Sequence, residues 1–172
     1  MSTKRLSTRA EADGWTLAGT FMGIAAGGVF LIFEMVIAGN TGSSAFIPVR
    51  MIGAIVLGEG ALPTQPTIGL AVVVPVALAF HFALSALYGA VFGAIATRLG
   101  ILRSSHLALI GAASIFGLLL WLVNFYVVAP VLFPWFLMSN PVVQFLAHTF
   151  FFGTVLGLLL AARPRARTGD EQ

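Results

Sequence analysis

Four long stretches of apolar residues constrain this chain more than any other feature of its sequence. They cover residues 15–38, 68–97, 107–128 and 141–162. A helix needs about 20 mostly apolar residues to cross the hydrocarbon core of a bilayer, and each stretch meets that length. Glycine and proline within them do not argue against helix, because membrane helices tolerate both. The sequence therefore predicts an all-α integral membrane protein, a bundle of four transmembrane helices.

The composition agrees with the bilayer as the main solvent. Hydrophobic residues make up 59% of the chain and charged residues 9%, whereas a soluble domain usually carries about 25% charged residues. The chain has no cysteine, which excludes disulfides and thiolate metal sites. It also lacks a phosphate loop, a nucleophile motif and a nucleic-acid module. These observations point away from an enzyme and from a nucleic-acid partner.

The basic residues predict the orientation of the four spans. Arg50 falls on one side of a four-span chain, and the other eight fall on the opposite side: Lys4, Arg5, Arg9, Arg98, Arg103, Arg163, Arg165 and Arg167. Short cytoplasmic loops carry an excess of Lys and Arg. We therefore expect a cytoplasmic basic segment at residues 1–14, a transmembrane domain at 15–162, and a cytoplasmic tail at 163–172. The lipid bilayer is the expected environment of this multi-pass protein.

The connection between the first two spans contains a second apolar segment, at residues 46–58. This segment is too short to cross a bilayer. It can lie in the interface or dip into the membrane as a re-entrant segment, and the sequence leaves both placements open.

Small residues recur every four positions in three of the spans. Residues with this spacing lie on one face of a helix, and small side chains there let two membrane helices approach closely. We expect these faces to pack within the bundle, although some of them can instead mediate homo-oligomerisation. The residues concerned are Gly19, Gly23 and Gly27 in the first span, Ser85, Gly89 and Gly93 in the second, and Gly153 and Gly157 in the fourth.

A weak internal similarity suggests a repeat of two helical hairpins. Aligning the first span with the third places Gly27 on Gly117 and Glu34 on Asn124. The second and fourth spans share the related strings "YGAVFG" and "FGTVLG". Some transporters are built from parallel repeats of this kind.

Each predicted span carries one conspicuous polar residue. Counted at 1.5 Å per residue from the cytoplasmic ends, Glu34, His81, Asn124 and His148 lie at similar depths, about 22 to 28 Å. Gln144 precedes His148 by four residues, so these two side chains share a helix face. Ionisable groups inside a membrane usually face the bundle interior or a wet cavity. The sequence therefore predicts a polar cluster near the outer face.

Glu34 needs a partner within this cluster. An isolated carboxylate in hydrocarbon is costly, so it pairs with another group or takes up a proton. A histidine or Asn124 can satisfy it. Arg50, the only basic residue on the outer side, can also reach Glu34 if the first outer loop folds inward.

Several functions are compatible with the cluster. The first is a structural role that fixes helix register, in an accessory or structural subunit of a larger membrane complex. The second is a proton- or ion-coupled carrier that uses Glu34 and the histidines. The third is a transition-metal site with His81, His148 and Glu34 as ligands. The fourth is a haem held between the two histidines.

Parts of the sequence resemble a family of uncharacterised bacterial inner-membrane proteins with four spans. The strings that carry the resemblance are "WLVNFYVVAP", "FPWF" and "NPVVQFLAHTFFFG", which lie within residues 117–157, and more loosely "FEMVIAG" and "IPVRMIGAIVLG". The resemblance implies a location in the bacterial cytoplasmic membrane. It implies no activity, substrate or catalytic residue.

Overall fold

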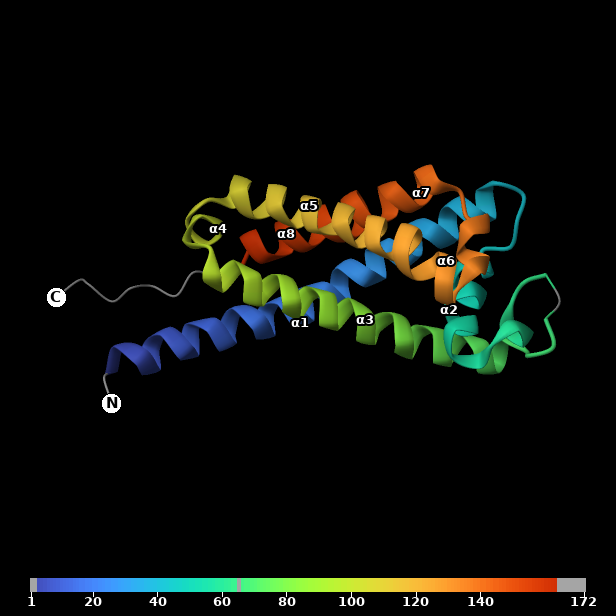
Figure 1. The fold of residues 1–172 in the computed structure, drawn as a ribbon, viewed down its shortest axis with the longest axis horizontal. Coiled ribbons are helices and arrows are strands. Elements are labelled where there is room, and N and C mark those ends of the chain that lie inside the picture. The colour runs from blue at the N-terminus through green and yellow to red at the C-terminus, as the bar shows by residue number, and fades with distance from the viewer. Residues whose placement is uncertain (1–2, 65, 164–172) are drawn as a thin grey trace.

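The computed structural model describes residues 3–64 and 66–163, and every regular element within them is helical (Figure 1). Four helices in this part of the chain are long and apolar enough to cross a membrane: Ala12–Asn40, Leu70–Arg98, His106–Leu132 and Pro141–Ala161. The prediction of four spans is therefore confirmed, with boundaries that differ by a few residues. The predicted tail at 163–172 lies outside the described residues, apart from Arg163.

The first half of the chain contains the two longest helices. Helix α1 (Thr3–Asn40) begins within the predicted N-terminal segment and continues without a break through the first span. A short helix, α2 (Ile47–Leu57), and a 3-10 turn, η1 (Glu59–Ala61), follow. Helix α3 (Leu70–Arg98) returns along α1.

The second half is more segmented. A short helix, α4 (Gly100–Ser104), leads to α5 (His106–Val123), which continues as η2 (Asn124–Val128) and α6 (Ala129–Leu132). A 3-10 segment, η3 (Pro134–Met138), makes the turn. The last span comprises α7 (Pro141–Leu146), η4 (Ala147–Thr154) and α8 (Val155–Ala161). The side chain of Asn140 caps α7 by accepting hydrogen bonds from two backbone N–H groups.

The beginning of the first span and the end of the last span lie at the same end of the bundle (Figure 1). There the Arg163 guanidinium lies 4.3 Å from the centre of the Trp15 ring, a cation–π contact. We call the opposite end the distal end. It carries α2 and the two connections at residues 41–69 and 133–140.

Glycine contacts hold α1 against α3. A Cβ added at Gly89 would meet the backbone of Gly19 and Gly23, and one added at Gly27 would meet the Ser85 side chain. The two helices can approach this closely only because their facing residues are small.

Small residues also allow close packing in the second hairpin, in which α5 lies against the last span. A Cβ added at Gly153 would meet the backbone of Ala113 and Gly117, and one at Gly157 would meet Ile110. All the small residues on the predicted faces of the second and fourth spans thus lie at helix contacts inside the described monomer.

Two segments of the spans are π-helical, η2 and η4. In η2 the Ala129 N–H donates to the Asn124 carbonyl, five residues earlier. Pro130 follows directly, and a proline ring clashes with the carbonyl four residues before it in a regular α-helix. The wider turn relieves this clash. Segments of this kind are rare and occur frequently at functional sites.

Helix α2 contacts both α1 and α3 at the distal end. Figure 1 shows that α1 and α3 cross and then diverge toward this end. Val49, Met51 and Ala54 of α2 are buried, and Gly53 lets α2 approach Val73 of α3. The apolar segment predicted at 46–58 is therefore a short helix that closes one side of the bundle.

Candidate functional site

The divergence of the helices leaves a cavity of about 690 Å³ in the distal half of the bundle. Its walls come from α1, α2, α3, the η2 region and the α7–η4 segment, and most of the lining side chains are aliphatic or aromatic. Thr41, Ser43 and Asn140, which are exposed, belong to the lining near the distal loops. The volume is within the range of about 300–1,000 Å³ that is typical of ligand pockets.

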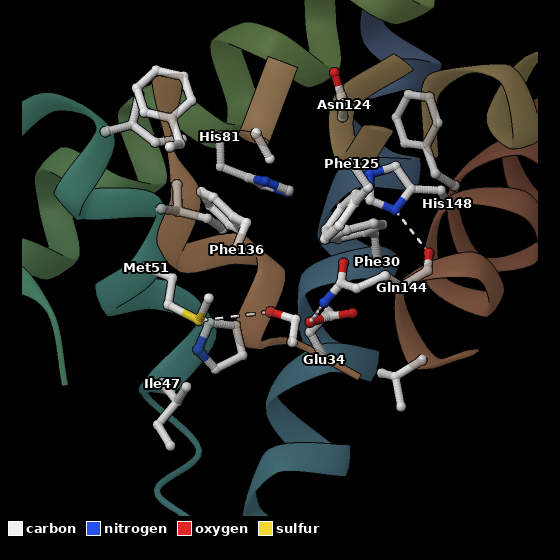
Figure 2. Close-up of a pocket in the computed structure, with 18 of the residues that line it drawn as sticks. Phe30, Glu34, Ile47, Met51, His81, Asn124, Phe125, Phe136, Gln144 and His148 are labelled. Atoms are coloured by element: carbon white, nitrogen blue, oxygen red, sulfur yellow. Dashed lines mark hydrogen bonds between the residues drawn. The ribbon is translucent and has the colours of Figure 1, made fainter. Parts of the chain in front are cut away.

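Glu34 and Gln144 form a buried pair on the wall of this cavity (Figure 2). The Gln144 Nε2 donates a hydrogen bond of 2.9 Å to the Glu34 Oε2, and each residue is only 7% exposed. The other carboxyl oxygen, Oε1, is buried without a hydrogen-bond partner among the described residues. A buried polar atom without a partner is costly. This oxygen can therefore still accept a hydrogen bond from a ligand.

Each histidine of the cavity is anchored through one ring nitrogen. The Nε2 of His81 lies 2.9 Å from the Gly27 carbonyl oxygen, and the Nδ1 of His148 lies 2.9 Å from the Gln144 carbonyl oxygen. Because a carbonyl oxygen only accepts, each of these ring nitrogens must carry the hydrogen. In the neutral rings the other nitrogens, Nδ1 of His81 and Nε2 of His148, are therefore acceptors.

Aromatic rings separate and orient these imidazoles. The Phe30 ring contacts both of them, with centroid distances of 5.6 Å to His81 and 4.9 Å to His148. The Phe125 ring lies 5.6 Å from His148, edge to face. A haem held by both histidines would need an open slot between their iron-binding nitrogens. In this arrangement Phe30 packs against both rings, so the two histidines do not frame such a slot.

The structure also does not bring the proposed metal ligands into one group. Within residues 3–64 and 66–163 there is no set of three or more His, Cys, Asp or Glu side chains that could hold a metal ion. Glu34, His81 and His148 all line the cavity, but they lie on different walls of it (Figure 2).

Asn124 is a further residue of the predicted polar cluster. Asn124 lines the cavity as the first residue of η2, and Figure 2 shows it at the opposite end of the view from Glu34. The expected partner of Glu34 is a histidine or Asn124, but the partner in the structure is Gln144.

The expectation that Arg50 reaches Glu34 is wrong. Arg50 does not line the cavity. Its Nη1 donates hydrogen bonds of 3.2 Å to the carbonyl oxygens of Ala61 and Ile68. These carbonyls belong to the connection between α2 and α3, and the guanidinium therefore fastens that loop.

Sequence reasoning missed the apolar part of the site. Phe30 precedes Glu34 by one helical turn, so its position on the same face was accessible from spacing alone. Phe136 and Met51 also line the cavity, but they come from the distal connections. The Trp135 Nε1 donates to the Met51 carbonyl oxygen at 3.2 Å and so joins these two connections. No sequence pattern indicates that long-range contact.

The fold and the site define a multi-pass helical membrane protein with a cavity in one half of its bundle. Comparisons of the chain with protein-family models, curated proteins and solved structures found no match.

Proposed function

We propose that this protein binds a small, largely apolar molecule within the membrane, in the distal cavity, with a polar group of the ligand at Glu34. The observation that carries the proposal is Glu34 itself, which lies on the wall of a cavity of about 690 Å³ and has one buried carboxyl oxygen without a partner among the described residues. Ligand pockets typically combine mostly apolar walls with a few placed polar groups.

This arrangement favours ligand binding over a purely structural role for the cluster. A polar cluster that only fixes helix register is expected to satisfy its own hydrogen bonds and to pack without a void. Here Gln144 satisfies one carboxyl oxygen of Glu34, and the other has no partner in the part of the chain that the structure describes. The structural and accessory-subunit function remains a separate proposal, supported if the protein co-purifies with a larger complex or as a homo-oligomer.

A cavity-filling substitution tests the ligand-binding function. Ala38 lines the cavity, and Ala83 is exposed and does not line it. The experiment measures binding of compounds that share a 3,3-diphenylpropyl body and differ in their polar ends to the protein in lipid nanodiscs. At least one of them should bind saturably to the wild type and to the control variant Ala83→Trp. It should not bind to Ala38→Trp, whose new side chain fills the cavity. Absence of saturable binding, or equal binding to Ala38→Trp, contradicts the proposal.

The carrier function is an extension of this proposal. Glu34, His81 and His148 all line the cavity, and both kinds of side chain can exchange protons. Proton flux in proteoliposomes, with Glu34→Gln as the comparison, tests it. The haem and metal functions remain predictions as well, and an absorbance spectrum and elemental analysis of the purified protein test them.

The orientation is also part of the proposal. We propose that the distal end faces away from the cytoplasm of a bacterial cell, because Arg50 is the only basic residue in the distal connections. The resemblance to bacterial inner-membrane proteins supports the choice of membrane. A parallel repeat of two hairpins stays a prediction: Gly89 meets the backbone of Gly19 and Gly23, and Gly153 meets that of Ala113 and Gly117, which is one helical turn away from the alignment of Gly27 with Gly117.

A further inference from the structure

The acid and the two imidazoles of the cavity all offer hydrogen-bond acceptors. Anchoring to backbone carbonyls fixes the hydrogens of His81 on Nε2 and of His148 on Nδ1, which leaves a lone pair on the other nitrogen of each neutral ring. One carboxyl oxygen of Glu34 has no partner within residues 3–64 and 66–163. Because the terminal torsion of a Glu side chain is soft, either oxygen can turn toward a donor in the cavity.

The charges of the residues that line the cavity favour a ligand that carries a positive charge. Among the described residues that line the cavity, Glu34 is the only acid, and no Lys or Arg accompanies it. An anionic ligand would find no cation to pair with, and it would meet a carboxylate. A cationic ligand would form a charge-assisted hydrogen bond with Glu34, the stronger class of such bonds.

The walls suit an organic cation rather than an inorganic one. Phe30, Phe125 and Phe136 line the cavity, and Figure 2 shows them grouped around the space between the two histidines. The faces of aromatic rings attract cations, and aromatic cages of this kind recognise alkylated ammonium groups. A small hydrated metal ion would leave most of the apolar wall unused.

We infer that the ligand of the distal cavity is a lipophilic organic cation with N–H donors, namely a primary or secondary amine on an aromatic or branched apolar body. The inference rests on the ligand-binding function proposed above. In the complex, the ammonium group donates to Glu34, the histidines accept further N–H groups where the ligand carries them, and the apolar body contacts the phenylalanines.

A matched set of four compounds tests the ligand class. They share the 3,3-diphenylpropyl body and end in a primary ammonium, a trimethylammonium, a hydroxyl or a carboxylate. Binding to the full-length protein in nanodiscs is measured by titration calorimetry, with empty nanodiscs as the blank. We expect the primary ammonium to bind at least about tenfold tighter than the alcohol, given the strength of hydrogen bonds to charged groups. The trimethylammonium should fall between them, and the carboxylate should not bind.

Two Glu→Gln variants localise the effect. Glu34→Gln should weaken binding of the primary ammonium about tenfold or more and leave the alcohol nearly unchanged. Glu59→Gln is the matched control, because Glu59 is an exposed acid at the same end of the bundle that does not line the cavity. It should bind like wild type.

The outcomes separate the two proposals. If the alcohol binds wild type as tightly as the ammonium, the cavity binds apolar ligands but the cation inference is overturned, a result that does not depend on the folding of any variant. If the trimethylammonium equals the primary ammonium, the requirement for N–H donors is overturned. If none of the four compounds binds saturably, both the inference and the ligand-binding function are overturned.

Discussion

Gln144 donates a hydrogen bond of 2.9 Å to Glu34 across 110 positions of the chain, and both side chains are buried. The bond joins α1 to α7, the first span to the last, at the distal end. The same glutamine also supplies, through its backbone carbonyl oxygen, the acceptor that anchors His148. Gln144 therefore positions both the acid and one imidazole of the cavity.

Removing the side chain of Gln144 should destabilise the protein. In Gln144→Leu the carboxyl group of Glu34 loses its partner while it remains buried, a situation that costs about 1–3 kcal/mol. We expect a lower free energy of unfolding, or a lower melting temperature in detergent. The double variant Glu34→Leu/Gln144→Leu should recover much of the loss, because it removes both polar partners together. If the effects of Gln144→Leu and of Glu34→Leu alone simply add in the double variant, the two side chains do not interact directly.

A methyl group at Gly89 should be poorly tolerated. It would meet the backbone of Gly19 and Gly23, which cannot yield as a flexible side chain can. We expect Gly89→Ala to lower the stability by about 1–3 kcal/mol, the usual cost of overpacking. Gly111→Ala is the control, because a Cβ at Gly111 meets nothing within 4 Å. Thermal unfolding of the two variants in one detergent compares them, and equal stabilities would contradict the close approach of α1 and α3.

Arg50 should control the order of the loop between α2 and α3. Arg50→Met removes the donors to the carbonyl oxygens of Ala61 and Ile68. Each hydrogen bond contributes about 1 kcal/mol, so amide hydrogen exchange of Ala61, Thr67 and Ile68 should accelerate about tenfold or more. Arg98→Gln, an exposed arginine outside this loop, should leave their exchange unchanged. If Arg50→Met also leaves it unchanged, the loop does not depend on the guanidinium.

The orientation can be measured with single cysteines, because the natural chain has none. Ser43→Cys lies in a distal connection, and Ser104→Cys lies between the second and third spans. A membrane-impermeant maleimide added to intact cells should label the first variant and not the second, while both should react after permeabilisation. The opposite pattern would reverse the proposed topology.

Binding of the primary ammonium should weaken as the pH falls. A proton on Glu34 removes the negative charge that attracts the ligand, and protons on His81 or His148 add positive charge to the same cavity. No Lys or Arg among the described lining residues offsets the trend, and the other polar groups there are Thr41, Ser43, Ser85, Tyr88, Asn124, Ser139, Asn140 and Gln144. Dissociation constants measured between about pH 8 and about pH 5 should rise for the ammonium and stay flat for the alcohol. A constant value for the ammonium would exclude Glu34 from its binding.

Much of the fold follows from the sequence, because hydrophobic length and the four-residue spacing of small residues are local signals. Those signals predicted four spans, and they identified Gly89 and Gly153 as packing positions. They also placed Glu34 and His81 on the small-residue faces of their helices, and they gave His148 a similar depth. Figure 2 shows these side chains around one space.

The remainder of the site depends on contacts that local patterns do not encode. Gln144 was identified by its spacing to His148, but its bond to Glu34 depends on how two hairpins dock. The cavity exists because α1 and α3 diverge and α2 enters beside them. The π-helical turns of η2 and η4 change the direction of the side chains after Asn124 and Ala147. A regular helical count does not reproduce such a change.

The central claim is that the distal cavity is the binding site of a cationic, largely apolar ligand. Photolabelling tests it most directly, with a 3,3-diphenylpropylammonium that carries an aryl diazirine on one ring. We predict that mass spectrometry will locate the label on cavity residues such as Phe30, Phe125 or Phe136. Excess unlabelled amine and the Ala38→Trp substitution should both suppress it. Labelling confined to exposed apolar residues such as Leu107, Ile115 or Val131, without competition by the amine, would contradict the claim.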